Sequence, residues 1–190
     1  MSTISAIILA AGKSIRMRQQ KMLMPWGNMT VLQNVIHTIQ KSGILDIVVI
    51  TNSEIASEAM KYGVQIEINN DGEMLTSLQL GLLAQKSSAK AVLICLGDQP
   101  QIEERSVRSV CEAFQKSGSN LVVPSFKFRR GHPWLVSREL WAEIVSIQDG
   151  TMRDFMNAHT KDIEYVNLDT PSILQDLDTP EDYLKYKPPM

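Results

Sequence analysis

The sequence predicts an α/β fold in which a mostly parallel central sheet carries helices on both faces. Short β-branched runs alternate along the chain with amphipathic stretches, as they do in βαβ units. The chain has 190 residues, of which 44% are hydrophobic, and this is enough to bury a complete core. We therefore expect a single domain over residues 1–190.

Five apolar runs have the length and composition of buried strands. In chain order they are residues 4–9, 47–51, 64–68, 91–96 and 121–124. Apolar residues at near-helical spacing predict helices in the intervening and following segments. These apolar positions are Val31, Leu32, Val35, Ile36 and Ile39; Leu75, Leu78, Leu82 and Leu83; Val107, Val110, Cys111 and Phe114; and Leu140, Trp141, Ile144 and Val145.

Residues 125–136 interrupt this alternation. Apolar and polar residues alternate there, and the run is broken by Gly131 and Pro133. This pattern predicts a hairpin or an edge insertion within the single domain.

Charge is distributed unevenly along the chain. The first 45 residues contain five cations and no carboxylate, although the whole chain has a formal net charge of -2. A nearly neutral chain has no general attraction to nucleic acid or to an anionic membrane, so neither is an expected partner. The local cations instead predict a binding site for a small anion.

Nothing in the sequence indicates a membrane span or a secretory signal. No apolar stretch approaches the roughly 20 residues that cross a bilayer, and no basic residue precedes the run at residues 4–11. Cys95 and Cys111 occupy positions typical of small buried side chains. We therefore expect a cytoplasmic protein.

The loop after the first predicted strand combines small residues with cations. Residues 10–12 allow a ligand to approach the backbone, whose N-H groups can point at phosphate oxygens. Arg16 can bind a phosphate through two hydrogen bonds, and Lys21 supplies a point charge. An ordinary solvated loop is the simpler alternative. A P-loop is excluded because that motif requires glycine where this chain has Ile7.

Carboxylates follow a later strand and recur near the end of the chain. Asp98 stands directly after the strand at residues 91–96, where it can hold Mg²⁺ against a triphosphate or bond its own backbone in a turn. Asp176 and Asp178 precede a helix start at Thr179 and Pro180. Either of these two aspartates can complete a metal site.

Two further polar positions have open interpretations. Thr76 and Ser77 stand where a loop turns into a helix, and they can cap that helix or bind the edge of a nucleotide base. His132, within residues 125–136, can act as a base, as a ligand or only as a polar residue. The scattered histidines and cysteines do not indicate a zinc site.

Five motifs follow one another along nearly the whole chain. They are Leu9-Ala10-Ala11-Gly12-x-Ser14-x-Arg16-Met17, Lys21-x-Leu23-x-Pro25-Trp26-Gly27, Gly97-Asp98-Gln99-Pro100, Gly131-His132-Pro133 and Asp176-Leu177-Asp178-Thr179-Pro180-Glu181-Asp182. In these motifs the chain resembles the molybdenum cofactor nucleotidyltransferases, which include molybdopterin-guanine dinucleotide synthases, and above all the cytidylyltransferase branch. The resemblance implies a Rossmann-like nucleotidyltransferase fold.

The resemblance also implies roles for individual residues. Leu9, Ala10, Ala11 and Gly12 would lie against the nucleotide, with Ser77 near its base. Arg16 and Lys21 would bind its phosphates. Asp98 would bind Mg²⁺, with Asp178 as a second metal ligand, and His132 would lie near the pterin.

The implied activity is a Mg²⁺-dependent transfer of CMP from CTP to the phosphate of a molybdopterin-type cofactor, with release of pyrophosphate. A molybdoenzyme would then receive the product. GTP in place of CTP, or a sugar phosphate as acceptor, are alternatives within the same chemistry. A non-catalytic molybdopterin-binding chaperone and a nucleotide-binding regulatory module are alternatives of other classes.

The chain departs from the family pattern at two places. Arg18 stands directly after the Arg-Met pair, where the family usually has glycine. A backbone with positive φ disfavours arginine there, so the additional cation either strengthens phosphate binding or marks a loop of different shape. Residues 148–153 match the Gly-Asp-x-Gly-x-Arg motif only at Asp149 and Arg153, and they receive no role.

Overall fold

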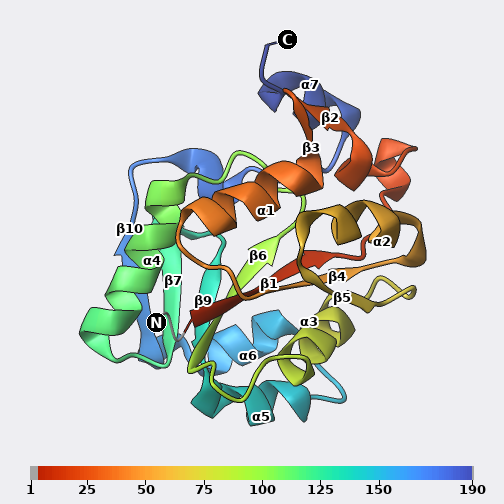
Figure 1. Ribbon diagram of the computed structural model, residues 1–190. Helices are drawn as coiled ribbons and strands as arrows, with labels where there is room; N and C mark the ends of the chain where they lie inside the picture. The colour runs from red at the N-terminus through yellow and green to blue at the C-terminus, as the bar shows by residue number, and fades with distance from the viewer. Residues whose placement is uncertain (1–3, 190) are drawn as a thin grey trace.

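The computed structural model describes residues 4–189, in which an eight-stranded sheet carries helices on both faces (Figure 1). The strand order is β10-β7-β9-β6-β1-β4-β5, and β8 pairs with β7. The strands are β1 (Ile4–Ala10), β4 (Ile47–Thr51), β5 (Gln65–Ile68), β6 (Ala91–Leu96), β7 (Leu121–Phe126), β8 (Arg129–Arg130), β9 (Trp134–Ser137) and β10 (Ile163–Asn167). A separate two-stranded sheet pairs β2 (Pro25–Trp26) with β3 (Met29–Thr30).

The sheet is mostly parallel, as the sequence predicts. The neighbours β6-β1-β4-β5 all pair in parallel, and so do β7 and β10. Parallel neighbours end at the same edge of a sheet, so the loops that follow β1, β5 and β6 converge there. This edge is where the sequence places its candidate site residues.

The segment at residues 125–136 corrects one expectation. Its first part forms the antiparallel hairpin β7–β8, whose turn places Lys127 and Phe128 at positive φ. Its last part enters β9, which lies inside the sheet between β6 and β7 and runs antiparallel to both. The predicted edge position is therefore wrong for β9, because the direction and partner of a strand are set by contacts distant in sequence.

Helices cover both faces of the sheet. On one face lie α1 (Val31–Lys41), α2 (Ser53–Ala59) and α4 (Glu104–Ser117), and on the other lie α3 (Met74–Leu83), α5 (Trp141–Val145) and α6 (Met152–Ala158) (Figure 1). The last helix, α7 (Pro180–Tyr186), lies beside β2 and β3. Short 3-10 turns are η1 (Ile15–Met17), η2 (Lys21–Leu23), η3 (Met60–Tyr62), η4 (Arg138–Leu140), η5 (Thr160–Asp162) and η6 (Pro171–Leu174).

Successive side chains of β1 point to opposite faces of the sheet and enter two separate layers of the apolar core. Ala6 and Ile8 pack with the α1 side, whereas Ile7 packs with the α3 side, because successive residues of a strand point to opposite faces. Gly81 lets α3 approach Ile7 closely, since a Cβ at this glycine would lie 2.8 Å from the Ile7 side chain. Both layers therefore hold β1 firmly, and the loop that follows it starts from a rigid strand.

Within residues 4–189, no helix has the length and apolar character that a membrane crossing requires.

Candidate functional site

The loops after β1 and β6 are joined by their backbones. The N-H group of Gly97 donates to the carbonyl of Leu9 at 2.9 Å. A Cβ at Gly97 would lie 2.9 Å from the Cβ of Ala10, so this contact requires glycine. Ala10 and Ala11 are buried at this junction. At Gly12 an added Cβ would meet no atom within 4 Å, so the backbone of the loop faces open space.

Ser14 closes the loop that carries the cations. Its hydroxyl donates to the side-chain oxygen of Gln20 at 3.0 Å and accepts from the N-H group of Lys21 at 3.2 Å. Ser14 itself has a left-handed backbone, with φ of 51°. These bonds bring the chain back toward the sheet at Lys21, whose side chain is only 11% exposed.

Two cations and two carboxylates meet at this edge of the sheet, and we call Arg16, Lys21, Asp98 and Asp178 the charged cluster. The ammonium group of Lys21 forms an ion pair with Asp98 and lies 3.6 Å from Asp178. The guanidinium group of Arg16 lies 3.0 Å from the other oxygen of Asp178. The structure thus brings together residues that the sequence places in four separate motifs.

Asp176 takes a different position from Asp178. Its carboxylate accepts a hydrogen bond of 2.5 Å from the side-chain amide of Gln99. Burial raises the pKa of Asp176, and the carboxylates of Asp98 and Asp178 raise it further, against the effect of the Gln99 hydrogen bond. Asp178, and not Asp176, shares a cation with Asp98.

The carboxylates of the charged cluster have the chemistry of a Mg²⁺ site. In residues 4–189 no three His, Cys, Asp or Glu side chains gather closely enough to enclose a metal ion alone. Mg²⁺ is commonly held by one or two carboxylates together with substrate phosphates. Asp98 and Asp178 already share one positive charge, that of Lys21, so the donor set fits a cation bound together with a phosphate.

Arg18 adopts the conformation for which glycine is better suited. Its φ is 56° and its ψ is 8°, and its N-H group donates to the carbonyl of Ile15 at 3.3 Å, which closes η1. A side chain in this region costs roughly 1 kcal/mol relative to glycine. The backbone conformation expected of glycine is therefore present, although arginine occupies the position.

Ser77 lies inside α3 and does not cap it. The residue before the helix is Glu73, whose side chain forms no capping bond, so the capping interpretation of Thr76 and Ser77 is wrong. Ser77 is 2% exposed, and its hydroxyl accepts from the side-chain amide of Asn69 at 2.8 Å. Asn69 also donates to the carbonyl of Glu73, so Ser77 helps to fix the loop after β5.

His132 lies at the entry to β9. Because β9 runs antiparallel to β6, its start lies at the edge where the parallel strands end. The imidazole stacks on the indole of Trp134, with ring centroids 4.3 Å apart and planes at 20°. Burial lowers the pKa of His132 to about 4. His132 is therefore neutral near pH 7.

The stacked rings of His132 and Trp134 line a cleft of about 720 Å³. Its other walls come from the start of α3, from β8 and from α6: Glu73, Met74, Leu75, Arg130, Gly150, Thr151, Met152, Arg153, Met156 and Asn157. The indole N-H of Trp134 is buried and has no hydrogen-bond partner in the described part of the chain. The cleft thus joins a flat aromatic wall to flexible methionines.

Two arginines of the cleft carry no role in the sequence interpretation. The guanidinium group of Arg130 donates to the hydroxyl of Tyr165 at 2.8 Å and lies over its ring, which fixes Arg130 beside the cleft. Arg153 enters from α6. The incomplete motif at residues 148–153 is the one sequence signal that includes Arg153.

One carbonyl links the charged cluster to the cleft. The oxygen of Ile173 accepts from the N-H group of His132 at 3.0 Å and from the side-chain amide of Gln99 at 3.4 Å. A Cβ at Gly131 would lie 2.4 Å from the same oxygen, so glycine is required for this contact. The two parts of the site are therefore adjacent and share a support.

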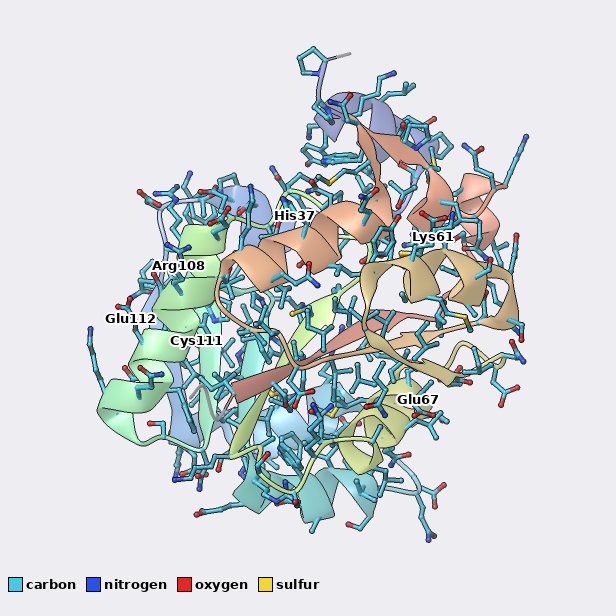
Figure 2. The ribbon with its side chains drawn as sticks, in the orientation of Figure 1. His37, Lys61, Glu67, Arg108, Cys111 and Glu112 are labelled. Carbon is cyan, nitrogen blue, oxygen red and sulfur yellow. The ribbon has the colours of Figure 1, made fainter. Side chains whose placement is uncertain are left out.

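Three histidine and cysteine side chains, those of His37, Cys111 and His159, lie away from the cleft. His37 on α1 and Cys111 on α4 belong to the helix layer on the face opposite α6 (Figure 2). Burial raises the pKa of Cys111 to about 11. His159 lies 2.8 Å from Glu143, on the α6 side of the sheet. None of these three lines the cleft.

Comparison with known protein families gives one match over most of the chain. The model of the MobA-like NTP transferase domain matches residues 6–163. A molybdenum cofactor cytidylyltransferase of Escherichia coli is 28% identical over 193 residues, which cover 98% of this chain and 97% of that protein.

Solved structures share the fold at low sequence identity. Rv0371c from Mycobacterium tuberculosis superimposes with a TM-score of 0.83 and 22% identity over 97% of this chain and 96% of the other. A second structure of that protein, in complex with manganese, has a TM-score of 0.77 and 22% identity over 98% of both chains. A CMP:2-keto-3-deoxy-manno-octonic acid synthetase complexed with CTP has a TM-score of 0.81 and 12% identity over 98% and 97%.

Proposed function

The chain belongs to the family of MobA-like NTP transferase domains and is thus a nucleotidyltransferase family enzyme, and from this premise we propose its reaction. It transfers CMP from CTP to the terminal phosphate of a molybdopterin-type cofactor, requires Mg²⁺ and releases pyrophosphate. The single observation that carries the proposal is the position of the charged cluster beside the cleft, with Ile173 linking them. All of residues 1–190 act as one domain in this proposal.

The nucleotide occupies the side of the charged cluster. Residues 9–12 contact the nucleotide in this proposal. The space beside Gly12 is open, so a ligand can approach the backbone there. Arg16 and Lys21 bind its phosphates, and Ser77, which is buried behind Asn69, lies near the base. The support for these roles is the family pattern together with the convergence of the three loops at one edge.

Asp98 and Asp178 would hold the Mg²⁺ ion. When bound, the ion would neutralise phosphate charge and polarise the phosphate that is attacked. The ion pairs of Lys21 and Arg16 then exchange: the ammonium and guanidinium groups leave the carboxylates and bind phosphate oxygens instead. Each cation has an anionic partner before and after this exchange, so the site does not have to bury an unpaired cation.

The reaction needs positioning more than it needs a base. A phosphate monoester with a second pKa of about 6 is mostly ionised near neutral pH, so its oxygen can attack without prior proton removal. The new bond forms between that oxygen and the α-phosphorus, and the bond from the α-phosphorus to the bridging oxygen breaks. The electron pair leaves with pyrophosphate, whose charge Arg16 and Lys21 stabilise.

The acceptor occupies the cleft. The stacked pair of His132 and Trp134 offers a flat surface for a planar ring, and Met152 and Met156 complete an apolar wall. Arg130 and Arg153 supply charge for the acceptor's phosphate. His132 is neutral, so it positions the ring and does not bind the phosphate as a cation. These features favour a pterin over a sugar phosphate.

The choice of CTP rests on the similarity to the E. coli cytidylyltransferase. GTP is the alternative nucleotide. The main reason to consider a non-catalytic chaperone is Arg18 in place of glycine. The loop keeps the left-handed turn in spite of this arginine, so that reason no longer applies. After transfer, a molybdoenzyme would receive the dinucleotide product.

Pyrophosphate release tests the proposal. The purified protein is incubated with Mg²⁺, one of the four NTPs, and either molybdopterin or a set of sugar phosphates. We expect release with CTP and molybdopterin together and none when either is omitted. Release with GTP alone among the nucleotides would correct the base, and release only with a sugar phosphate would correct the acceptor. Binding of Mg²⁺ and CTP without turnover would favour the chaperone.

A further inference from the structure

Arg18 is a cation for which the described protein provides no internal partner. In the charged cluster, Arg16 and Lys21 pair with Asp178 and Asp98. Across residues 4–189, by contrast, the side chain of Arg18 forms no hydrogen bond and no ion pair, and it is exposed. The N-H group of Arg18 donates to the carbonyl of Ile15, but its side chain makes no contact of this kind that offsets the unfavourable left-handed backbone.

Arg18 lines a surface hollow of about 570 Å³ next to the charged cluster. The same loop contributes Arg16 and Ile15, and the start of α7 contributes Thr179, Pro180 and Glu181. Arg16 borders the hollow and also binds Asp178, so the hollow continues directly from the charged cluster. The carboxylate of Glu181 also lines the hollow, and because Arg16 is paired with Asp178, Arg18 is the guanidinium group of the hollow that has no partner within residues 4–189.

The position of the hollow decides which part of an anion it can reach. If the reacting phosphate of a triphosphate lies at Asp98 and Lys21, the phosphates that follow it can extend past Arg16 into the hollow that Arg18 lines. A guanidinium group binds a terminal phosphate well, because its N-H groups match two phosphate oxygens at once. A monophosphate held at the same reacting position does not extend so far.

We propose that Arg18 binds the outermost phosphate of the nucleoside triphosphate in this hollow and so makes the site select triphosphates over shorter nucleotides. The inference rests on the proposed function, because it takes a nucleotide as the ligand. Arg18 is then a specificity-determining residue. Its contact to the phosphate offsets the strain that glycine at this position would avoid.

The test compares two substitutions that relieve the same backbone conformation. Arg18→Gly removes the proposed contact. Lys127→Gly is the matched control, because Lys127 is also a cation at positive φ, with φ of 48°, but lies in the β7–β8 turn. Each substitution should raise the melting temperature by a few degrees, since glycine accepts this conformation without strain. A common rise shows that both variants fold.

Binding is measured by calorimetry with Mg²⁺ and with CTP, CMP or inorganic tripolyphosphate as probes. In Arg18→Gly we expect about tenfold weaker binding of CTP and of tripolyphosphate and unchanged binding of CMP, whereas Lys127→Gly should match the wild type throughout. Equal CTP affinity in the wild type and Arg18→Gly would overturn the proposal.

The tripolyphosphate probe separates the two proposals. If the wild type binds tripolyphosphate in an Arg18-dependent way but binds no nucleotide, the phosphate contact stands and the proposed function fails. If the wild type binds neither, both proposals are overturned.

Discussion

In the charged cluster, side chains hold one another by opposite charge, whereas in the cleft they are positioned by burial and ring stacking. Lys21 and Arg16 neutralise Asp98 and Asp178 across three segments of the chain. His132 and Trp134 stack, and the partial burial of His132 lowers its pKa to about 4, so it stays neutral near pH 7. The two parts of one site are thus built on different physical interactions.

The charged cluster and the cleft should respond differently when a ligand binds. Ion pairs can exchange partners without opening a cavity, so the charged cluster can accept a metal ion and phosphates by rearranging its charges. A stacked ring pair keeps its shape whether or not a ligand lies on it. We therefore expect the charged cluster to respond to changes of charge and the cleft to respond to changes of packing and protonation.

The largest expected effect comes from Asp98→Asn. This substitution removes the charge that both Lys21 and the proposed Mg²⁺ ion require, while it keeps the shape of the side chain. Pyrophosphate release should fall by at least about 100-fold, which corresponds to roughly 3 kcal/mol of transition-state stabilisation. Circular dichroism should show that the fold is retained.

A matched control for Asp98→Asn is Asp46→Asn. Asp46 also pairs with a lysine, Lys86 at 2.8 Å, but it precedes β4 at the opposite edge of the sheet. Its substitution should leave pyrophosphate release unchanged. Full activity in Asp98→Asn would refute the assignment of the charged cluster.

A smaller effect is expected from the protonation of His132. The pKa of His132 is about 4 in the folded protein, below the ordinary 6.5, so the unfolded chain binds this proton more readily. The stabilisation by neutral His132 is complete above pH 6.5 and is lost as the pH falls from 6.5 toward 4. The free energy of unfolding should fall by about 2–3 kcal/mol over this range.

Urea unfolding of the wild type and of His132→Asn, measured from pH 7.5 to pH 4.5, isolates this contribution. The stability difference between the two should shrink toward low pH. His159→Asn serves as a control of opposite sign: Glu143 raises the pKa of His159, so its stabilisation is present below pH 6.5 and is lost as the pH rises through the folded pKa. A constant difference between wild type and His132→Asn would contradict a buried neutral histidine.

The smallest expected effect is on metal binding by Lys21→Met. The ammonium group of Lys21 now occupies the space between Asp98 and Asp178, so it competes with any other cation there. Its removal should strengthen binding of Mn²⁺, measured by electron paramagnetic resonance without nucleotide, by about five- to tenfold, or roughly 1 kcal/mol. Lys86→Met is the control. Unchanged or weaker Mn²⁺ binding in Lys21→Met would argue against charge exchange.

Local patterns in the sequence were sufficient to predict most of the sheet. The strands at residues 47–51 and 91–96 have the predicted bounds, because short β-branched runs between turns indicate buried parallel strands. The interior position of β9 was not predictable in this way. A run of four residues does not specify its partner or its direction, and β9 pairs with a strand about 40 residues earlier.

The candidate site was predictable where motifs are intact. Separate motifs predict Lys21 and Asp98 as site residues, and the structure places them in contact although they are 77 residues apart. Their pairing was not predictable, because each motif was interpreted with a ligand and not with the other. The sequence does not single out Arg153, because its motif is only partly present, or Arg130, because neighbouring cations such as Arg129 and Arg130 are common on any surface.

The carbonyl of Ile173 also limits how this enzyme can be recombined with its relatives. Since a Cβ at Gly131 would lie 2.4 Å from that oxygen and 2.7 Å from the Ile173 side chain, the segment at residues 131–134 has to be compatible with the segment around Ile173. A chimera that exchanges residues 131–134 therefore has to transfer the segment around Ile173 with them. The smallest part of this site that can be exchanged is thus a pair of segments that lie far apart in the sequence.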